Sequence, residues 1–194
     1  MPKNTKDKLL NSALSLIDKK QFHEISTKEI AQQSGMAEVT LFRHFKSKDT
    51  ILEILAEKFF KLMVGFNSEN IKNENDFRME LINYFNKSIS DNFLHRRLFK
   101  LFLYIGCYRK DMFLKYANVY ERQIAGPIER TVEYGKNHWG YQNVDTEIVV
   151  KLLINSIGFF NIVQNVFLHR EVQPYDFKKV INIAIDNFFK TLKK

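Results

Sequence analysis

The residues best suited to contacting DNA bases lie between positions 37 and 45 of this 194-residue chain. If this segment is a short helix, Ala37, Leu41 and Phe45 share one face, which we expect to point into a core. The opposite face carries Val39, Thr40 and Arg43. Arginine can donate two hydrogen bonds to guanine, and valine or threonine can touch a thymine methyl group. The alternative interpretation is a short exposed helix that simply carries mixed surface residues.

A second short helix and a glycine turn precede this segment and would position it. The run Ser26-Thr27-Lys28-Glu29 has the pattern of a capping box, which begins a helix that ends at Gly35. A short helix, a tight turn and a second short helix form a helix-turn-helix. In that motif the second helix enters the major groove of DNA, and the first crosses the phosphate backbone.

The rest of the chain predicts an all-α protein of about nine helices. Apolar residues recur at helical spacing, strand-like alternation is scarce, and only seven glycines and three prolines interrupt the pattern. Besides the two short helices, the expected helices span residues 4–20, 48–66, 77–89, 94–107, 111–138, 146–169 and 175–191. Pro127, after Gly126, should kink the longest of them because proline lacks an amide hydrogen.

Charge and composition narrow the class of protein. Lys and Arg (30) exceed Asp and Glu (22), a formal net charge of +8 that favours a polyanionic partner such as nucleic acid or an acidic membrane surface. The five histidines are scattered, cysteines are not paired, and there is no glycine-rich phosphate loop, so neither a metal site nor a cofactor is expected. A helical enzyme therefore remains only a minor alternative to a DNA-binding protein.

The same features predict a cytoplasmic protein without a membrane segment. A single cysteine, Cys107, cannot form an internal disulfide, and the first residues lack the apolar core of a signal peptide. The most apolar stretch, residues 148–168, is interrupted by Lys151 and several Asn and Gln residues, so it is too polar to span a bilayer.

Three stretches together resemble the DNA-binding signature of the TetR family of ligand-released regulators. They are TKEIAQQSGM at 27–36, TLFRHFKSKD at 40–49, and Ile51-Leu52. Beyond them the chain resembles the family only in its length, its helical content and the break at 140–145 before two final helices. The resemblance implies a repressor that binds a palindromic double-stranded DNA operator as a homodimer. A DNA-binding activator or architectural protein without a ligand is the alternative.

The resemblance also assigns roles to individual residues of the motif. It implies phosphate contacts by Thr27, His44 and Lys48, and contacts with base edges by Lys28, Glu38, Val39, Thr40 and Arg43. Thr27 and Lys48 begin helices, where free amides favour anions, whereas His44 has a hydrogen bond within the turn as an alternative. Phe42 stands where the family usually has a tyrosine, and it lacks the hydroxyl that could bind phosphate. Ala37 replaces a frequent serine cap, which costs roughly 1 kcal/mol.

The resemblance further implies two domains, a DNA-binding domain at 1–48 and a helical ligand-binding and dimerisation domain at 49–194. Many aromatic residues of the second domain belong to its core, but a cavity among its first four helices would suit an apolar or aromatic molecule. The expected lining residues are Met63, Phe66, Phe85, Phe99, Phe102, Tyr104, Tyr120 and Gln123.

The last two helices carry more apolar surface than one side of a helix needs in a monomer. We therefore expect a two-fold dimer built as a four-helix bundle. The expected interface residues are Ile157, Phe160, Val163, Phe167, Ile181, Ile185 and Phe188.

Overall fold

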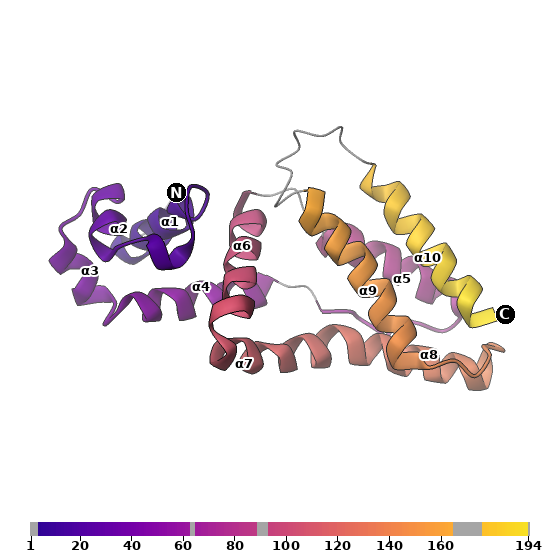
Figure 1. Cartoon of the computed structure of the whole chain (residues 1–194). Coiled ribbons are helices and arrows are strands. Elements are labelled where there is room, and N and C mark those ends of the chain that lie inside the picture. The colour runs from indigo at the N-terminus through magenta and orange to yellow at the C-terminus, as the bar shows by residue number, and fades with distance from the viewer. Residues whose placement is uncertain (1–3, 63–64, 89–92, 165–175, 194) are drawn as a thin grey trace. The chain divides into compact units, whose positions relative to one another are not determined.

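The computed structural model describes residues 4–62, 65–88, 93–164 and 176–193, and all regular elements in these ranges are helical (Figure 1). The α-helices are α1 (Thr5–Leu16), α2 (Thr27–Gln33), α3 (Glu38–His44), α4 (Lys48–Leu62), α5 (Glu74–Ser88), α6 (Phe93–Tyr108), α7 (Lys110–Tyr120), α8 (Gly126–His138), α9 (Thr146–Ile162) and α10 (Phe177–Lys193). The predicted all-α class is confirmed. Two helices are shorter than predicted: α1 ends at Leu16, and a short 3₁₀ helix, η1 (Phe22–Glu24), follows it, while α4 ends at Leu62.

The chain forms two compact units. Unit 1 comprises residues 1–62 and 91–115, and unit 2 comprises residues 63–90 and 116–194. Unit 1 thus holds the whole expected DNA-binding domain together with α4, α6 and the beginning of α7. One contact that joins α6 to the N-terminal helices is an ion pair with the segment after α1, in which Arg97 Nε lies 2.6 Å from Asp18 Oδ2.

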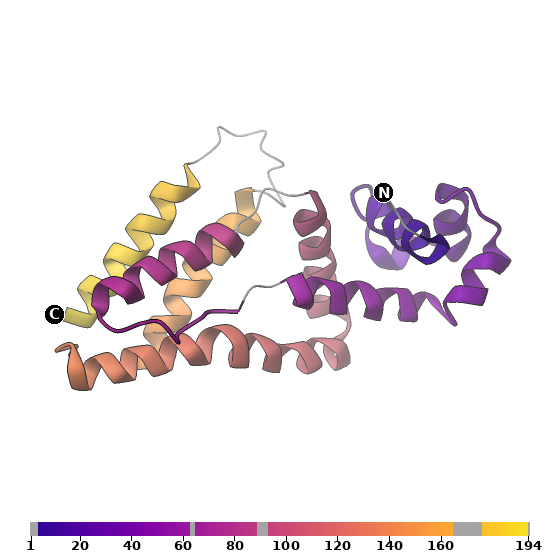
Figure 2. The ribbon, with the colours of Figure 1, turned by 180° about the vertical axis from the view of Figure 1, so that it is seen from behind.

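The core of unit 1 is built where amphipathic helices converge. In unit 1, α1 packs against α2, α3 and α6, and α4 packs against α6. Figure 2 shows the crossing of α4 and α6 from behind. Leu9 and Leu14 of α1, Ile30 of α2 and Leu55 of α4 are almost fully buried. Burial of these apolar side chains supplies most of the stability that three short helices cannot obtain from helix propensity alone.

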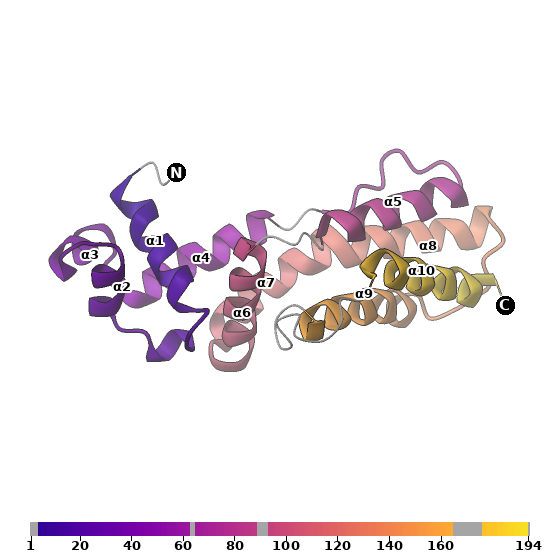
Figure 3. The ribbon, with the colours of Figure 1, turned by 90° about the horizontal axis from the view of Figure 1, so that it is seen from above.

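Unit 2 is a helical bundle in which α10 packs against α5 and α9, and α9 packs against α8 (Figure 3). Its core includes Phe77 of α5, Ile128 of α8, Val150 of α9 and Ile185 of α10. Phe77 lies at the centre of an aromatic cluster, because the centre of its ring is 5.6 to 6.2 Å from the ring centres of Trp139, Phe188 and Phe189.

The predicted irregularity near Pro127 takes the form of a π turn, Glu121–Ala125, between α7 and α8. The amide of Gly126 donates to Glu121 O, five residues earlier. Pro127 cannot donate to the carbonyl of Gln123, four residues before it. That carbonyl instead accepts a 2.8 Å hydrogen bond from the backbone amide of Phe66. The proline therefore leaves the carbonyl of Gln123 free to accept this hydrogen bond. The bond holds the segment before α5 against the π turn between α7 and α8.

Candidate DNA-binding site

Hydrogen bonds fix both ends of α2, and its C-terminal end forms the turn that leads to α3. The predicted capping box is confirmed: Glu29 N donates to Ser26 Oγ (3.2 Å), and Ser26 N donates to Glu29 Oε2 (2.8 Å). At the other end Met36 N donates to Ala31 O and Gly35 N donates to Gln32 O, which is the Schellman pattern. Gly35 has φ +73°, a conformation that strains any L-residue.

Glu29 itself is held strongly in its ionised form. A side-chain hydrogen bond from Lys20, followed by backbone and hydroxyl hydrogen bonds from Ser26, lowers the pKa of Glu29 to about 2. The carboxylate that caps α2 is thus also the partner of a lysine close to the end of α1.

Helix α3 presents the face that the sequence predicted. Leu41 and Phe45 are buried, while Val39 is 67% exposed and Arg43 is exposed. Thr40 is half-buried rather than fully outward. Ala37 does not point into the core as predicted, but is exposed, because it is the N-cap with extended backbone (φ −73°, ψ 147°) and lies outside the helical rotation. It also makes no side-chain cap hydrogen bond.

The two residues that begin α2 and α3 bind each other. Thr27 Oγ1 donates a 2.5 Å hydrogen bond to Glu38 Oε1, and both side chains are partly buried. In this structure the hydroxyl expected to contact a phosphate therefore holds the carboxylate expected to contact a base. Lys28, Phe42 and His44 are exposed, and the His44 ring lies 6.4 Å from that of Phe45.

Lys48, the third residue expected to contact a phosphate, is directed into unit 1. Its ammonium donates to the carbonyl oxygens of Phe22 (3.1 Å), His23 (3.0 Å) and Ile25 (2.9 Å). It also lies 5.2 Å from the centre of the Phe22 ring. Burial lowers the pKa of Lys48. Sequence reasoning did not find these partners, since the carbonyls lie more than twenty residues before Lys48.

The expected ligand-lining residues are divided between the two units. Phe66 and Phe85 of unit 2 are buried around Tyr84, with ring centres 6.0 Å and 5.1 Å from its own. Burial raises the pKa of Tyr84 to about 12, and it also raises the pKa of the partly buried Tyr120. Tyr84 was not among the expected lining residues, although it stands beside Phe85 in the sequence. The side chain of Gln123 is exposed.

The remaining expected lining residues belong to unit 1, except Met63, which lies outside the described residues. Phe99 and Phe102 pack with each other and with Phe59 and Phe60 of α4, at ring-centre distances of 5.4 to 6.0 Å. Tyr104 stacks on His23 at 5.9 Å and lies 5.8 Å from the Phe22 ring. Tyr104 thus touches η1, the same segment whose carbonyls bind Lys48.

The structure corrects the expected dimer residues. Four of the seven are buried within the core of unit 2, so they have no surface to offer a partner: Ile157, Ile181, Ile185 and Phe188. Phe160 and Val163 are partly exposed, and Phe167 lies outside the described residues. The large apolar side chains that α9 and α10 do expose are Ile148, Leu152, Phe159 and Ile183.

Within the described parts of the chain, no group of three or more His, Cys, Asp or Glu residues could hold a metal ion. Nor is any described helix long and apolar enough to cross a membrane.

The fold and the site together define a helix-turn-helix protein of the kind that binds DNA. Residues 9–55 match the family model described as bacterial regulatory proteins, tetR family. A curated relative, the uncharacterized HTH-type transcriptional regulator YvkB of Bacillus subtilis, is 39% identical over 51 residues. This match spans only 26% of the present chain and 27% of that relative.

Solved structures share the fold over nearly the whole chain. The TetR-family regulator PfmR from Thermus thermophilus has a TM-score of 0.69 and 16% identity, and the comparison covers 96% of this chain and 99% of that one. SmeT, the repressor of the Stenotrophomonas maltophilia multidrug efflux pump SmeDEF, has a TM-score of 0.65 and 16% identity, covering 100% and 92%. Residues 9–55 thus match the DNA-binding segment of the TetR family, and nearly the whole chain shares the fold of solved TetR-family regulators.

Proposed function

We propose that this regulator is a repressor, which binds a palindromic operator as a homodimer and is released by a small apolar or aromatic molecule. The observation that carries the DNA-binding part is the geometry of α3. Its inner face is anchored by Leu41 and Phe45, while Val39 and Arg43 project from the opposite face. A short helix held rigidly in this way can place both side chains in a major groove.

The dimer is supported by the apolar surface of unit 2. Ile148, Leu152 and Phe159 of α9 are all more than half exposed, and their spacing of four and seven residues places them on one face of the helix. An exposed apolar stripe of this kind favours a protein interface. Pairing of this stripe with its copy would give a two-fold symmetric contact, and such symmetry would match a palindromic operator.

Release by an effector is supported by contacts within each unit. In unit 2, Phe66, Tyr84 and Phe85 form an aromatic group with a buried tyrosine hydroxyl. In unit 1, Tyr104 of α6 contacts η1 directly. An effector releases the protein only if it binds the DNA-free conformation more tightly than the DNA-bound one, because equal affinity for both shifts no equilibrium.

Selection of binding sites from a pool of random duplexes tests the DNA-binding proposal even though the operator sequence is not specified. We expect a near-palindromic site whose half-sites lie about one helical turn, or a multiple of it, apart. We expect Arg43 to contact a guanine, so Arg43→Ala should lose about 1 to 3 kcal/mol on that site and much less on a scrambled duplex.

Lys72→Ala is the charge-matched control, because Lys72 is an exposed lysine of unit 2. It should bind both duplexes like the parent protein. If Arg43→Ala and the parent show the same affinity and the same preference for the selected site, Arg43 contacts no base of that site, which contradicts the role proposed for it.

A further inference from the structure

The contacts of Lys48 leave its ammonium no free hydrogen for DNA. A lysine ammonium has three N–H donors, and in this structure they are matched by three backbone carbonyls at 2.9 to 3.1 Å. The side chain is also partly buried over the Phe22 ring. To contact a phosphate, Lys48 would have to break these hydrogen bonds and expose the three carbonyls to water.

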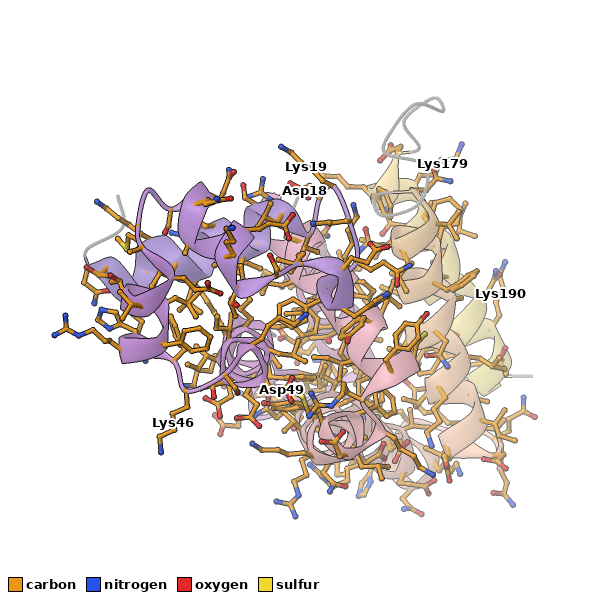
Figure 4. All side chains as sticks on the ribbon, turned by 60° about the vertical axis from the view of Figure 1, so that its left-hand side comes forward. Asp18, Lys19, Lys46, Asp49, Lys179 and Lys190 are labelled. Carbon is orange, nitrogen blue, oxygen red and sulfur yellow. The ribbon has the colours of Figure 1, made fainter. Side chains whose placement is uncertain are left out.

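Lys46, two residues earlier, lies in the opposite situation. Phe45 has an extended backbone (φ −134°, ψ 124°) and a buried side chain. Successive side chains of an extended segment point to opposite sides, so the residue after Phe45 is directed outward. Lys46 is exposed, and Figure 4 shows its side chain extending away from the ribbon of unit 1.

The charge of Lys46 is also available for a polyanion. Within the described residues it takes part in no ion pair and no hydrogen bond. The next acidic residue along the chain, Asp49, lies 3.1 Å from Nη1 of Arg109 and is thus paired elsewhere. On the N-terminal side, Arg43 is an exposed cation three residues away on α3. Lys46 therefore extends the exposed positive charge of α3 beyond the end of that helix.

We infer that Lys46, and not Lys48, neutralises a DNA phosphate beside α3, and that Lys48 instead holds the start of α4 against η1. This inference rests on the proposed binding of DNA through α3. Under this inference, loss of each lysine changes a different measured property. Loss of Lys46 changes how DNA affinity depends on salt, because each neutralised phosphate releases counterions. Loss of Lys48 changes the stability of unit 1.

The test compares Lys46→Met and Lys48→Met with the parent protein and with Lys72→Met, which removes an exposed charge from unit 2. Each protein is titrated with a random-sequence duplex between about 50 and 200 mM salt, and its melting temperature is measured without DNA. A random sequence suffices because phosphate contacts do not depend on the bases.

We expect Lys46→Met to flatten the slope of log affinity against log salt by about 0.9 for each bound chain, with an unchanged melting temperature. Lys48→Met should melt at a lower temperature and keep the slope of the parent and of Lys72→Met. A parental slope for Lys46→Met, or a flattened slope for Lys48→Met, would overturn the assignment alone. A parent protein that does not bind the duplex at the lowest salt concentration would refute the proposed function as well.

Discussion

The proposed dimer interface shifts from the residues that the sequence suggested to the exposed apolar face of α9. Leu152 is 65% exposed and Phe159 is 63% exposed on the same face of α9. Ile157, between them in sequence, is 1% exposed and belongs to the core. We predict that Leu152→Glu combined with Phe159→Glu converts the proposed dimer to a monomer that keeps its helical fold.

The size of this effect follows from the exposed fraction. Full burial of a leucine or phenylalanine side chain contributes about 1.5 to 3 kcal/mol, so the exposed two thirds is worth about 1 to 2 kcal/mol when a partner covers it. Two substitutions in each of two chains remove four such contributions, about 4 to 8 kcal/mol in total. Since about 1.4 kcal/mol is a factor of ten, dimer affinity should fall by at least about a thousandfold.

Sedimentation at micromolar concentration gives the assay, with circular dichroism as the check on folding. The parent should sediment as a dimer and the double variant as a monomer with parental helix content. Met79→Glu is the matched control, because Met79 is an exposed apolar residue on a different helix, α5. A monomeric parent, or a double variant that stays dimeric, would refute the reasoning. Ile181→Glu should instead unfold unit 2, because Ile181 lies in its core.

Two smaller predictions concern the helix-turn-helix (residues 27–44). Gly35→Ala should destabilise the protein by about 1 kcal/mol in urea unfolding, since Gly35 has φ +73°; unchanged stability would contradict the strain argument. Because the pKa of Glu29 is lowered from 4.5 to about 2, its contribution to stability is present above about pH 4.5 and is lost as the pH falls towards 2. The urea midpoints of the parent and Glu29→Gln should therefore converge on acidification, and a pH-independent difference would argue against this linkage.

The sequence sufficed where structure depends on neighbours along the chain. The capping box of Ser26 and Glu29, the glycine turn at Gly35 and the buried face of α3 each depend on residues within a few positions, and each was predicted. The helical periodicity failed at Ala37, where the chain has not yet entered the helix. Local periodicity therefore predicted the helices and their buried faces. It did not predict the exposure of the residue that caps the start of α3.

Long-range packing set the limits of prediction for α9 and α10. Helix α9 carries apolar residues on several faces, whereas α10 has one apolar stripe. Periodicity alone could not tell whether a given stripe packs inside unit 2 or remains exposed. Which stripe is covered depends on the positions of α5 and α8, and those positions are tertiary information. The same holds for Lys48, whose residue type suits a phosphate and three carbonyls equally well.

The contacts of η1 favour one way in which an effector could act on the DNA-binding helices. Lys48 of α4 holds the carbonyls of η1, and Tyr104 of α6 packs against its rings. Phe22 and Ile25 in turn are buried in unit 1. A displacement of α6 alone would have to break the ring contacts of Tyr104 with η1. A displacement of α4 alone would have to break the hydrogen bonds of Lys48 to the same segment. It costs less to move α6, α4 and the helix-turn-helix together. Under the proposed function, an effector should therefore change the spacing between the two helix-turn-helix motifs of the proposed dimer, with α2 and α3 keeping their internal geometry.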